Sequence, residues 1–222
     1  MKLFADTANL QEIEELLQSG AIQGITTNPS LLSKEPKADF FEHIQKICDL
    51  CEKYNVDIPV SVEVFATEPD SMIEQAIVIC ERITYDNINI KIPVGFAELR
   101  VISELAKKGI RVNCTCCFTD TQLELAALSG ARYVSLFYNR LIDVGGDPLK
   151  ALQRVRKFIE TNDLDCEIIS GSIRNAYDLS DCWANGSHIV TAGHGVIKKA
   201  TQHVKTDESV EGFIKDFEAW IK

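Results

Sequence analysis

Apolar residues recur along this chain with two different periods, one typical of β-strands and one typical of helices. Residues 87–93 place three isoleucines on one face of a predicted strand and Asn89 and Lys91 on the opposite face. Residues 9–19 instead carry leucine and isoleucine at the spacing of an amphipathic helix, which ends at Gly20. The two patterns follow one another from the N-terminus to the C-terminus.

This alternation predicts eight strands, each followed by a helix. The predicted strands cover residues 1–7, 21–27, 57–65, 87–92, 111–117, 133–137, 166–170 and 188–191. The predicted helices cover residues 9–19, 38–54, 68–83, 96–108, 120–129, 148–161, 176–184 and 196–203, and a last helix covers 210–221 after an N-cap within 206–209. Regular strand–helix repetition of this kind is typical of a (β/α)8 barrel, the TIM barrel.

A doubly wound sheet is the alternative fold. The first strand, however, leads into Asp6-Thr7-Ala8-Asn9, without the glycine-rich loop that often follows the first strand of that fold. No linker or low-complexity stretch interrupts the chain. We therefore predict a single barrel domain over residues 1–222, with residues 206–222 as an additional C-terminal helix.

Composition narrows the classes of partner. The 222 residues carry a formal net charge of −10, which disfavours nucleic acid but permits a small anion held by one or two arginines. No apolar run is long enough to span a membrane, and residues 1–6 enter a strand pattern without the build of a signal peptide. A cytoplasmic protein with no membrane contact is expected.

The eight cysteines do not predict a metal site or a disulfide scaffold. Cys48 and Cys51 form one C-x2-C pair in a predicted helix, no second pair follows, and the four histidines lack zinc-ligand spacing. Eight cysteines are also too few, in a chain of this length, for a disulfide-stabilised fold. We expect reduced, mostly buried thiols and no metal.

Polar side chains gather at the carboxyl ends of seven of the eight predicted strands, where a barrel carries its active site. They are Asp6, Thr26, Thr27, Asn28, Glu63, Lys91, Asn113, Thr115, Ser135, Arg140, Ser172 and Arg174. Each has an ordinary explanation by itself: Asp6 could cap a helix, and Lys91 could reach solvent along an apolar strand. Their convergence on one end of the barrel favours a functional site.

A lysine between two carboxylates suits Schiff-base chemistry. The neutral amine of Lys91 could attack a ketone, and Asp6 and Glu63 could carry the protons that imine formation and carbon–carbon cleavage require. A protonated imine is itself an electron sink, so this chemistry needs no cofactor. Arg140, Ser172 and Arg174 could bind a phosphate group.

Seven motifs stand at or beside these strand ends. They are Asp6-Thr7-Ala8-Asn9, Gly24-Ile25-Thr26-Thr27-Asn28-Pro29-Ser30-Leu31, Val62-Glu63-Val64, Ile90-Lys91-Ile92-Pro93, Asn113-Cys114-Thr115, Ser135-Leu136-Phe137 and Ser172-Ile173-Arg174-Asn175. In this order they resemble the transaldolases, in particular the short single-domain branch that also contains the fructose-6-phosphate aldolases. The resemblance extends from about residue 3 to the C-terminal helix.

The resemblance implies a class I mechanism of the pentose phosphate pathway, with sugar phosphates as substrates. Lys91 would form the Schiff base, Asp6 would take the hydroxyl proton during cleavage, and Glu63 with Thr115 would hold a proton-shuttling water. The remaining implied contacts are Thr26, Asn28, Asn113, Ser135 and Phe137 with the bound sugar unit, and Arg140, Ser172 and Arg174 with the phosphate. A homo-oligomer, a pentamer or decamer, is implied as well, with the last helix crossing to a neighbour.

Two positions separate group transfer from aldol cleavage within that branch. Fructose-6-phosphate aldolases typically have glutamine in place of Glu63 and tyrosine in place of Phe137, so the resemblance favours the transferase. Leu136, Asn139 and residues 191–194 depart from the usual transaldolase pattern, where proline and glycine are common at positions 136 and 139. The substrate, including its anionic group, stays open, as does the role of His194.

Overall fold

The computed structural model describes residues 1–221, and its eight strands form one closed, parallel barrel. The strands are β1 Lys2–Asp6, β2 Ile25–Thr26, β3 Val60–Glu63, β4 Ile88–Pro93, β5 Val112–Cys117, β6 Tyr133–Phe137, β7 Glu167–Gly171 and β8 Ile189–Ala192. Each strand pairs with the next in sequence, and β8 closes the ring on β1. The predicted TIM barrel with a C-terminal helix is confirmed.

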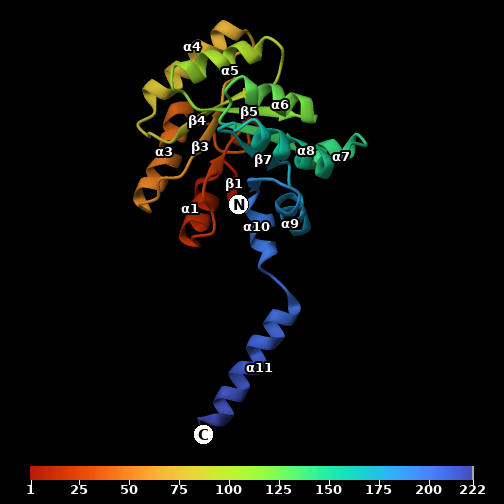
Figure 1. Ribbon diagram of the computed structural model, residues 1–222. Helices are drawn as coiled ribbons and strands as arrows, with labels where there is room; N and C mark the ends of the chain where they lie inside the picture. Colours follow the sequence, from red (N-terminus) through yellow and green to blue (C-terminus); the bar gives the residue numbers. More distant parts are fainter. Residues whose placement is uncertain (222) are drawn as a thin grey trace.

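Helices follow the strands and surround the barrel (Figure 1). The barrel helices are α1 Leu10–Gln18, α3 Phe40–Lys53, α4 Pro69–Arg82, α5 Glu98–Lys107, α6 Asp120–Leu128, α8 Pro148–Thr161, α9 Ala176–Ala184 and α10 His194–Ala200. Their apolar faces and the outward strand residues, Ile88, Ile90 and Ile92 among them, form the main core. The helices also lack the length and hydropathy for a bilayer crossing, as far as residues 1–221 are concerned.

The inward-facing side chains change character along the barrel axis. At the amino ends of the strands the interior holds an apolar cluster of Phe4, Tyr133, Ile169 and Ile189. Gly24 makes room for it, since a Cβ there would lie 2.4 Å from Cζ of Phe4. Inward residues nearer the carboxyl ends are polar, so the apolar cluster closes the floor beneath a polar pocket.

Three helices differ most from the sequence prediction; among the others, α10 ends at Ala200 rather than at the predicted 203. Two short ones were not predicted: α2 Pro29–Leu32 and α7 Tyr138–Asp143. The first forms because the Asn28 side chain accepts the Leu31 N–H, which turns an apparent loop signal into an N-cap. The third, α11 Val204–Trp220, begins before the predicted start at 210 because the His203 side chain caps it.

The last helix is separate from the barrel. Figure 1 shows α11 (blue) extending away from the strands and the other helices, and it has no buried residue. Val210, Phe213, Ile214 and Phe217 lie on one of its faces, each at least half exposed. An apolar stripe of this kind is normally covered in a folded assembly.

Candidate active site

A cavity of about 210 Å³ opens at the carboxyl ends of the strands. Its lining residues come from every strand or the loop that follows it: Asp6, Thr26, Asn28, Pro29, Ser30, Glu63, Lys91, Asn113, Thr115, Cys116, Ser135, Phe137, Arg140, Gly171, Ser172 and Thr191. With two exceptions, Arg174 and Thr27, the site residues predicted from the sequence lie together here. The Thr27 hydroxyl donates instead to the carbonyl oxygen of Ser61. Parallel strands of a closed barrel explain this, because inward residues at their carboxyl ends face one another across the axis.

Lys91 lines the pocket from β4. In the strand register it is paired with Glu63 on β3 and Asn113 on β5. Its Nζ is 2.9 Å from Oε2 of Glu63 and donates a hydrogen bond of 2.8 Å to the carbonyl oxygen of Thr27. The side chain is only 7% exposed. An ammonium has three donors, so these two contacts leave one hydrogen for a ligand.

Asp6 lies at the end of β1, beside Thr26 of β2. Burial raises the pKa of its carboxyl group, and the charge of Lys91 together with the Thr26 hydrogen bond opposes part of that rise. Thr26 Oγ1 is 2.8 Å from Oδ1 of Asp6 and 2.6 Å from Oγ1 of Thr191. The hydroxyls therefore fix the orientation of a carboxyl group that is easier to protonate than an ordinary aspartate.

Asn113 is fixed by a chain of buried hydrogen bonds. Its Nδ2 donates to Oγ of Ser61 at 3.2 Å, and its Oδ1 accepts from Oγ of Ser135 at 2.6 Å. Both partners are serine hydroxyls, which hold the amide group in place from its two sides. Asn113 and Ser135 thus line the cavity as a hydrogen-bonded pair.

Thr115 has a buried hydroxyl that lacks a hydrogen-bond partner among residues 1–221. Such a group is costly unless a water or ligand satisfies it. Just beyond it the register of β5 shifts between Cys114 and Cys117, and Cys116 takes a positive φ of 62°. The bulge turns Cys116 toward the pocket, in line with the use of bulges to redirect side chains beside functional sites.

Arg140 and Ser172 form the cationic corner of the pocket. The Arg140 guanidinium lies 4.8 Å from the centre of the Phe137 ring, which packs edge-on against Phe118 at 5.7 Å. This cation–π contact restrains the Arg140 side chain against the Phe137 ring. Ser172 has a positive φ of 60° in the loop after β7.

Arg174 does not line the pocket, although the sequence suggested that it belongs to the phosphate-binding group. Its guanidinium makes a two-pronged ion pair with Asp143 of α7, with Nη1 2.7 Å from Oδ1 and Nη2 on Oδ2. Arg174 lowers the pKa of the Asp143 carboxyl in turn. Asp143 belongs to the helix that the sequence pattern did not predict, so this competing partner was not foreseen.

Five lining residues were not predicted, and one of them could have been. Thr191 ends the predicted eighth strand and therefore meets the criterion used for the other strands. The other four reach the pocket through features that the sequence pattern did not predict. Pro29 and Ser30 belong to the short helix α2, Cys116 lies in the β5 bulge, and Gly171 is the last residue of β7. His194 stays outside the pocket lining and lies 2.9 Å from Oε2 of Glu15, which links α10 to α1.

The cysteines contribute neither disulfides nor metal ligands in the part of the chain that the structure describes. All eight are free thiols, with Sγ of Cys114 and Cys117 3.9 Å apart. Residues 1–221 contain no cluster of three His, Cys, Asp or Glu side chains suited to a metal ion.

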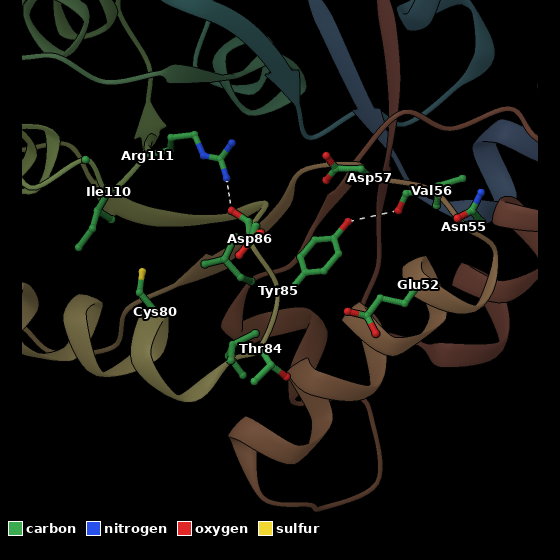
Figure 2. A pocket seen from close by; sticks show the side chains of 13 residues that line it. Glu52, Asn55, Val56, Asp57, Cys80, Thr84, Tyr85, Asp86, Ile110 and Arg111 are labelled. Atoms are coloured by element: carbon green, nitrogen blue, oxygen red, sulfur yellow. Dashed lines mark hydrogen bonds between the residues drawn. The ribbon is translucent and has the colours of Figure 1, made fainter.

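A larger cavity, about 890 Å³, lies at the opposite end of the barrel, among the loops that lead into β3, β4 and β5. Figure 2 shows its side chains. Arg111 donates to the carbonyl oxygen of Asp86, and the Tyr85 hydroxyl donates to that of Ile58 at 2.8 Å, so these groups brace the loops. Barrel enzymes carry chemistry at the other end, where Lys91 lies.

Comparison with known proteins shows the family to which the chain belongs. Residues 3–221 match the family model described as Transaldolase/Fructose-6-phosphate aldolase. The chain is 39% identical over 217 residues to a "Probable transaldolase" of Clostridium perfringens strain SM101, covering 98% of this chain and 97% of that protein. The chain belongs to the transaldolase/fructose-6-phosphate aldolase family. The resemblance found in the sequence motifs is thereby confirmed.

Other members of this family are similarly close. A "Probable transaldolase 2" of Listeria monocytogenes is 38% identical over 220 residues, covering 99% of this chain and 97% of that protein. Among solved structures, the thiamine phosphate pyrophosphorylase of Pyrococcus furiosus aligns with a TM-score of 0.61 over 92% of this chain and 94% of that chain. Because the sequence identity to this pyrophosphorylase is only 15%, the structural similarity shows the barrel fold alone.

Proposed function

We propose that this member of the transaldolase/fructose-6-phosphate aldolase family is a class I transaldolase. It would transfer a dihydroxyacetone unit from a ketose phosphate to an aldose phosphate through a Schiff base on Lys91. The observation that carries the proposal is the buried Lys91 amine, 2.9 Å from Glu63 within a pocket that also contains Asp6. A lysine so enclosed is rare unless it is paired or its amine is used chemically, and here the paired group is the carboxylate proposed to accept its proton.

Imine formation begins at Nζ of Lys91. Glu63 accepts a proton from the ammonium, and the free amine attacks the ketone carbon to give a carbinolamine. Loss of the former carbonyl oxygen as water leaves the protonated imine. The unpartnered hydroxyl of Thr115 supports this step, because a water bound to it could pass protons between Glu63 and the departing oxygen.

Carbon–carbon cleavage follows from the protonated imine. The Asp6 carboxylate removes the proton of the hydroxyl on the far carbon of the breaking bond. That carbon leaves as the aldehyde of an aldose phosphate, and the bonding electrons form an enamine on Lys91. A carboxyl group with a raised pKa is a stronger base than an ordinary aspartate and gives its proton back less readily to water. Addition of the enamine to an acceptor aldehyde reverses these steps.

Several fixed polar groups would orient the sugar unit. Asn113 and Ser135 are joined by a hydrogen bond of 2.6 Å, and Thr26 is held by Asp6 and Thr191. Asn28, at the start of α2, offers an amide at the pocket rim. Arg140 and Ser172 would bind the phosphate at the cationic corner.

The pocket carries phenylalanine at position 137, and we propose transfer rather than release for that reason. Replacing Phe137 with tyrosine is expected to raise the rate of dihydroxyacetone release from fructose 6-phosphate about tenfold, since a phenol can hold and protonate a water and phenylalanine cannot. Release is measured as free dihydroxyacetone without acceptor. Phe118→Tyr is the matched control, because Phe118 packs on Phe137 without lining the pocket. An unchanged release rate in Phe137→Tyr contradicts this account of selectivity.

Fructose 6-phosphate, with and without erythrose 4-phosphate, tests the proposed reaction directly. A transaldolase forms sedoheptulose 7-phosphate only when the acceptor is present, whereas an aldolase forms dihydroxyacetone without it. Borohydride treatment during the incubation, followed by peptide mass analysis, should find the reduced adduct on Lys91. A barrel that only binds sugar phosphates would give no adduct and no product, and that result would refute the proposal.

We also propose that the protein acts in the cytoplasm. Its eight thiols are free and mostly buried, as is usual for proteins of a reducing compartment.

A homo-oligomer, a pentamer or decamer, completes the proposal, with α11 as the contact. The apolar stripe of α11, formed by Val210, Phe213, Ile214, Phe217 and Trp220, is at least half exposed throughout. Five large apolar residues on one helical face are typical of a helix that packs on another surface. A second copy of the chain is the partner implied by the family resemblance.

Changing Phe213 and Phe217 together to serine is expected to convert the assembly to smaller species, because it removes the middle of the α11 stripe. Analytical ultracentrifugation measures the change. Lys215→Ser, on the opposite face of α11, is the matched control and should keep the mass of the unaltered protein. An unaltered protein that sediments as a monomer would exclude the oligomer.

A further inference from the structure

The cationic corner of the pocket is built from two segments that are distant in sequence. Arg140 belongs to α7, and Ser172 belongs to the loop between β7 and α9. The affinity of such a corner for an anion depends on the spacing of its two groups. What holds α7 against the loop therefore matters for binding.

Asn139 connects these two segments. It precedes Arg140 on α7, is buried, and is not among the residues that line the pocket. Its Nδ2 donates to the carbonyl oxygen of Ser172 at 3.0 Å and to Oδ2 of Asp178 at 2.6 Å. One side chain thus holds both the loop and the start of α9.

Asp178 fastens the rest of the loop. Its Oδ2 also accepts the backbone N–H of Arg174 at 3.0 Å and that of Asn175 at 3.2 Å. Its Oδ1 accepts from Nδ2 of Asn175 at 3.0 Å. The carboxylate is buried and fully engaged, so it behaves as a structural anchor rather than a free acid.

The backbone conformation of Ser172 has to be stabilised by neighbouring residues, because its φ angle is positive. Its φ of 60° lies in the left-handed region, where a residue with a Cβ is strained. A conformation of this kind persists only where the surroundings fix it. The hydrogen bond from Asn139 ends on the carbonyl of this same residue.

We propose that Asn139, held by Asp178, is a positioning residue that sets the distance between Arg140 and Ser172 and thereby the affinity for the anionic end of the substrate. The inference rests on the proposed function insofar as that end is a phosphate. Asn139 does not line the pocket, so it acts through the two residues that do.

Titration with inorganic phosphate by calorimetry tests the inference without requiring turnover. Asn139→Asp keeps the shape of the side chain but loses both donated hydrogen bonds, and Asn139→Ala removes them without adding charge. Each variant is expected to bind phosphate at least about tenfold more weakly, the effect of misplacing one charged contact. The KM for fructose 6-phosphate should rise in parallel, with kcat within about threefold of the unaltered enzyme.

Ser187→Ala is the matched control. Ser187 is buried and makes two hydrogen bonds, 2.9 Å to Oγ of Ser170 and 2.7 Å to the carbonyl oxygen of Ile189, so its loss has a similar structural cost outside the pocket. It should lower the melting temperature and leave phosphate affinity unchanged. If one Asn139 variant fails to fold, the other carries the measurement.

The outcomes separate this inference from the proposed reaction. Equal phosphate affinity in a folded Asn139 variant and the unaltered protein overturns the positioning role, even if the enzyme transfers dihydroxyacetone. An unaltered protein that binds no phosphate overturns it as well. Weakened phosphate binding without any Lys91 adduct would instead support the positioning role and refute the proposed reaction.

Discussion

Replacing Lys91 with alanine is expected to lower kcat by about 10⁴-fold or more, because the covalent intermediate can no longer form. Borohydride trapping with fructose 6-phosphate should give no adduct in this variant. Lys91→Arg retains the cation beside Glu63 but has no amine that can form an imine, so it should be equally inactive. A coupled assay for the released aldose phosphate and intact-protein mass analysis measure both effects.

The two Lys91 variants should differ in stability. Alanine leaves the carboxylate of Glu63 and the carbonyl of Thr27 without the partner that now lies within 2.9 Å of each, and stranding a buried charge is destabilising. Arginine preserves the charge and should keep a higher melting temperature. Lys53→Ala, which breaks the surface ion pair with Glu14, is the control for lysine loss as such. Residual imine trapping in Lys91→Ala would show that another lysine carries the chemistry.

The position of Lys91 could be predicted because two simple regularities act together. Inward and outward side chains alternate along a strand, so Asn89 and Lys91 had to share the face opposite the isoleucines. The ends of parallel strands meet at one rim of a barrel, so Asp6, Glu63 and Lys91 had to approach one another. Neither regularity depends on loop conformation.

The cationic corner could not be predicted fully because loops and short helices determine it. Arg174 lies three residues after the end of β7, yet its guanidinium is paired with Asp143, 31 residues earlier. The β5 bulge that directs Cys116 into the pocket also has no signal in the alternation of side chains, since a bulge breaks that alternation. The positions of Arg174 and Cys116 depend on local backbone geometry, and that of Arg174 also depends on the ion pair with Asp143.

Replacing Asp6 with asparagine is expected to lower kcat by about 10²–10⁴-fold, the range for loss of a general acid–base group. Asparagine keeps the shape of the side chain and an oxygen to accept the Thr26 hydrogen bond, but it cannot take the hydroxyl proton. Cleavage should therefore fail after imine formation, so borohydride should still trap the ketose on Lys91. A variant that keeps full activity would remove Asp6 from the mechanism.

The same substitution should stabilise the protein at neutral pH, because the raised pKa of Asp6 means that the folded state binds its proton more tightly than the unfolded state does. The unfolded state then binds fewer protons, so this group's contribution to stability falls as pH rises from the ordinary pKa toward the folded value. Asp6→Asn removes that fall, and its melting temperature should exceed that of the unaltered protein at pH 7 by more than at pH 4.

Asp120→Asn is the control of opposite sign, since Arg154 lowers the pKa of Asp120. This variant should be less stable than the unaltered protein at pH 7, and the difference should be smaller in acid. The acidic limb of the unaltered enzyme's kcat/KM profile should likewise lie above the ordinary aspartate pKa of 3.8 and disappear in Asp6→Asn. A base strong enough for the cleavage step therefore carries a cost in stability, which is expected of a residue retained for its chemistry.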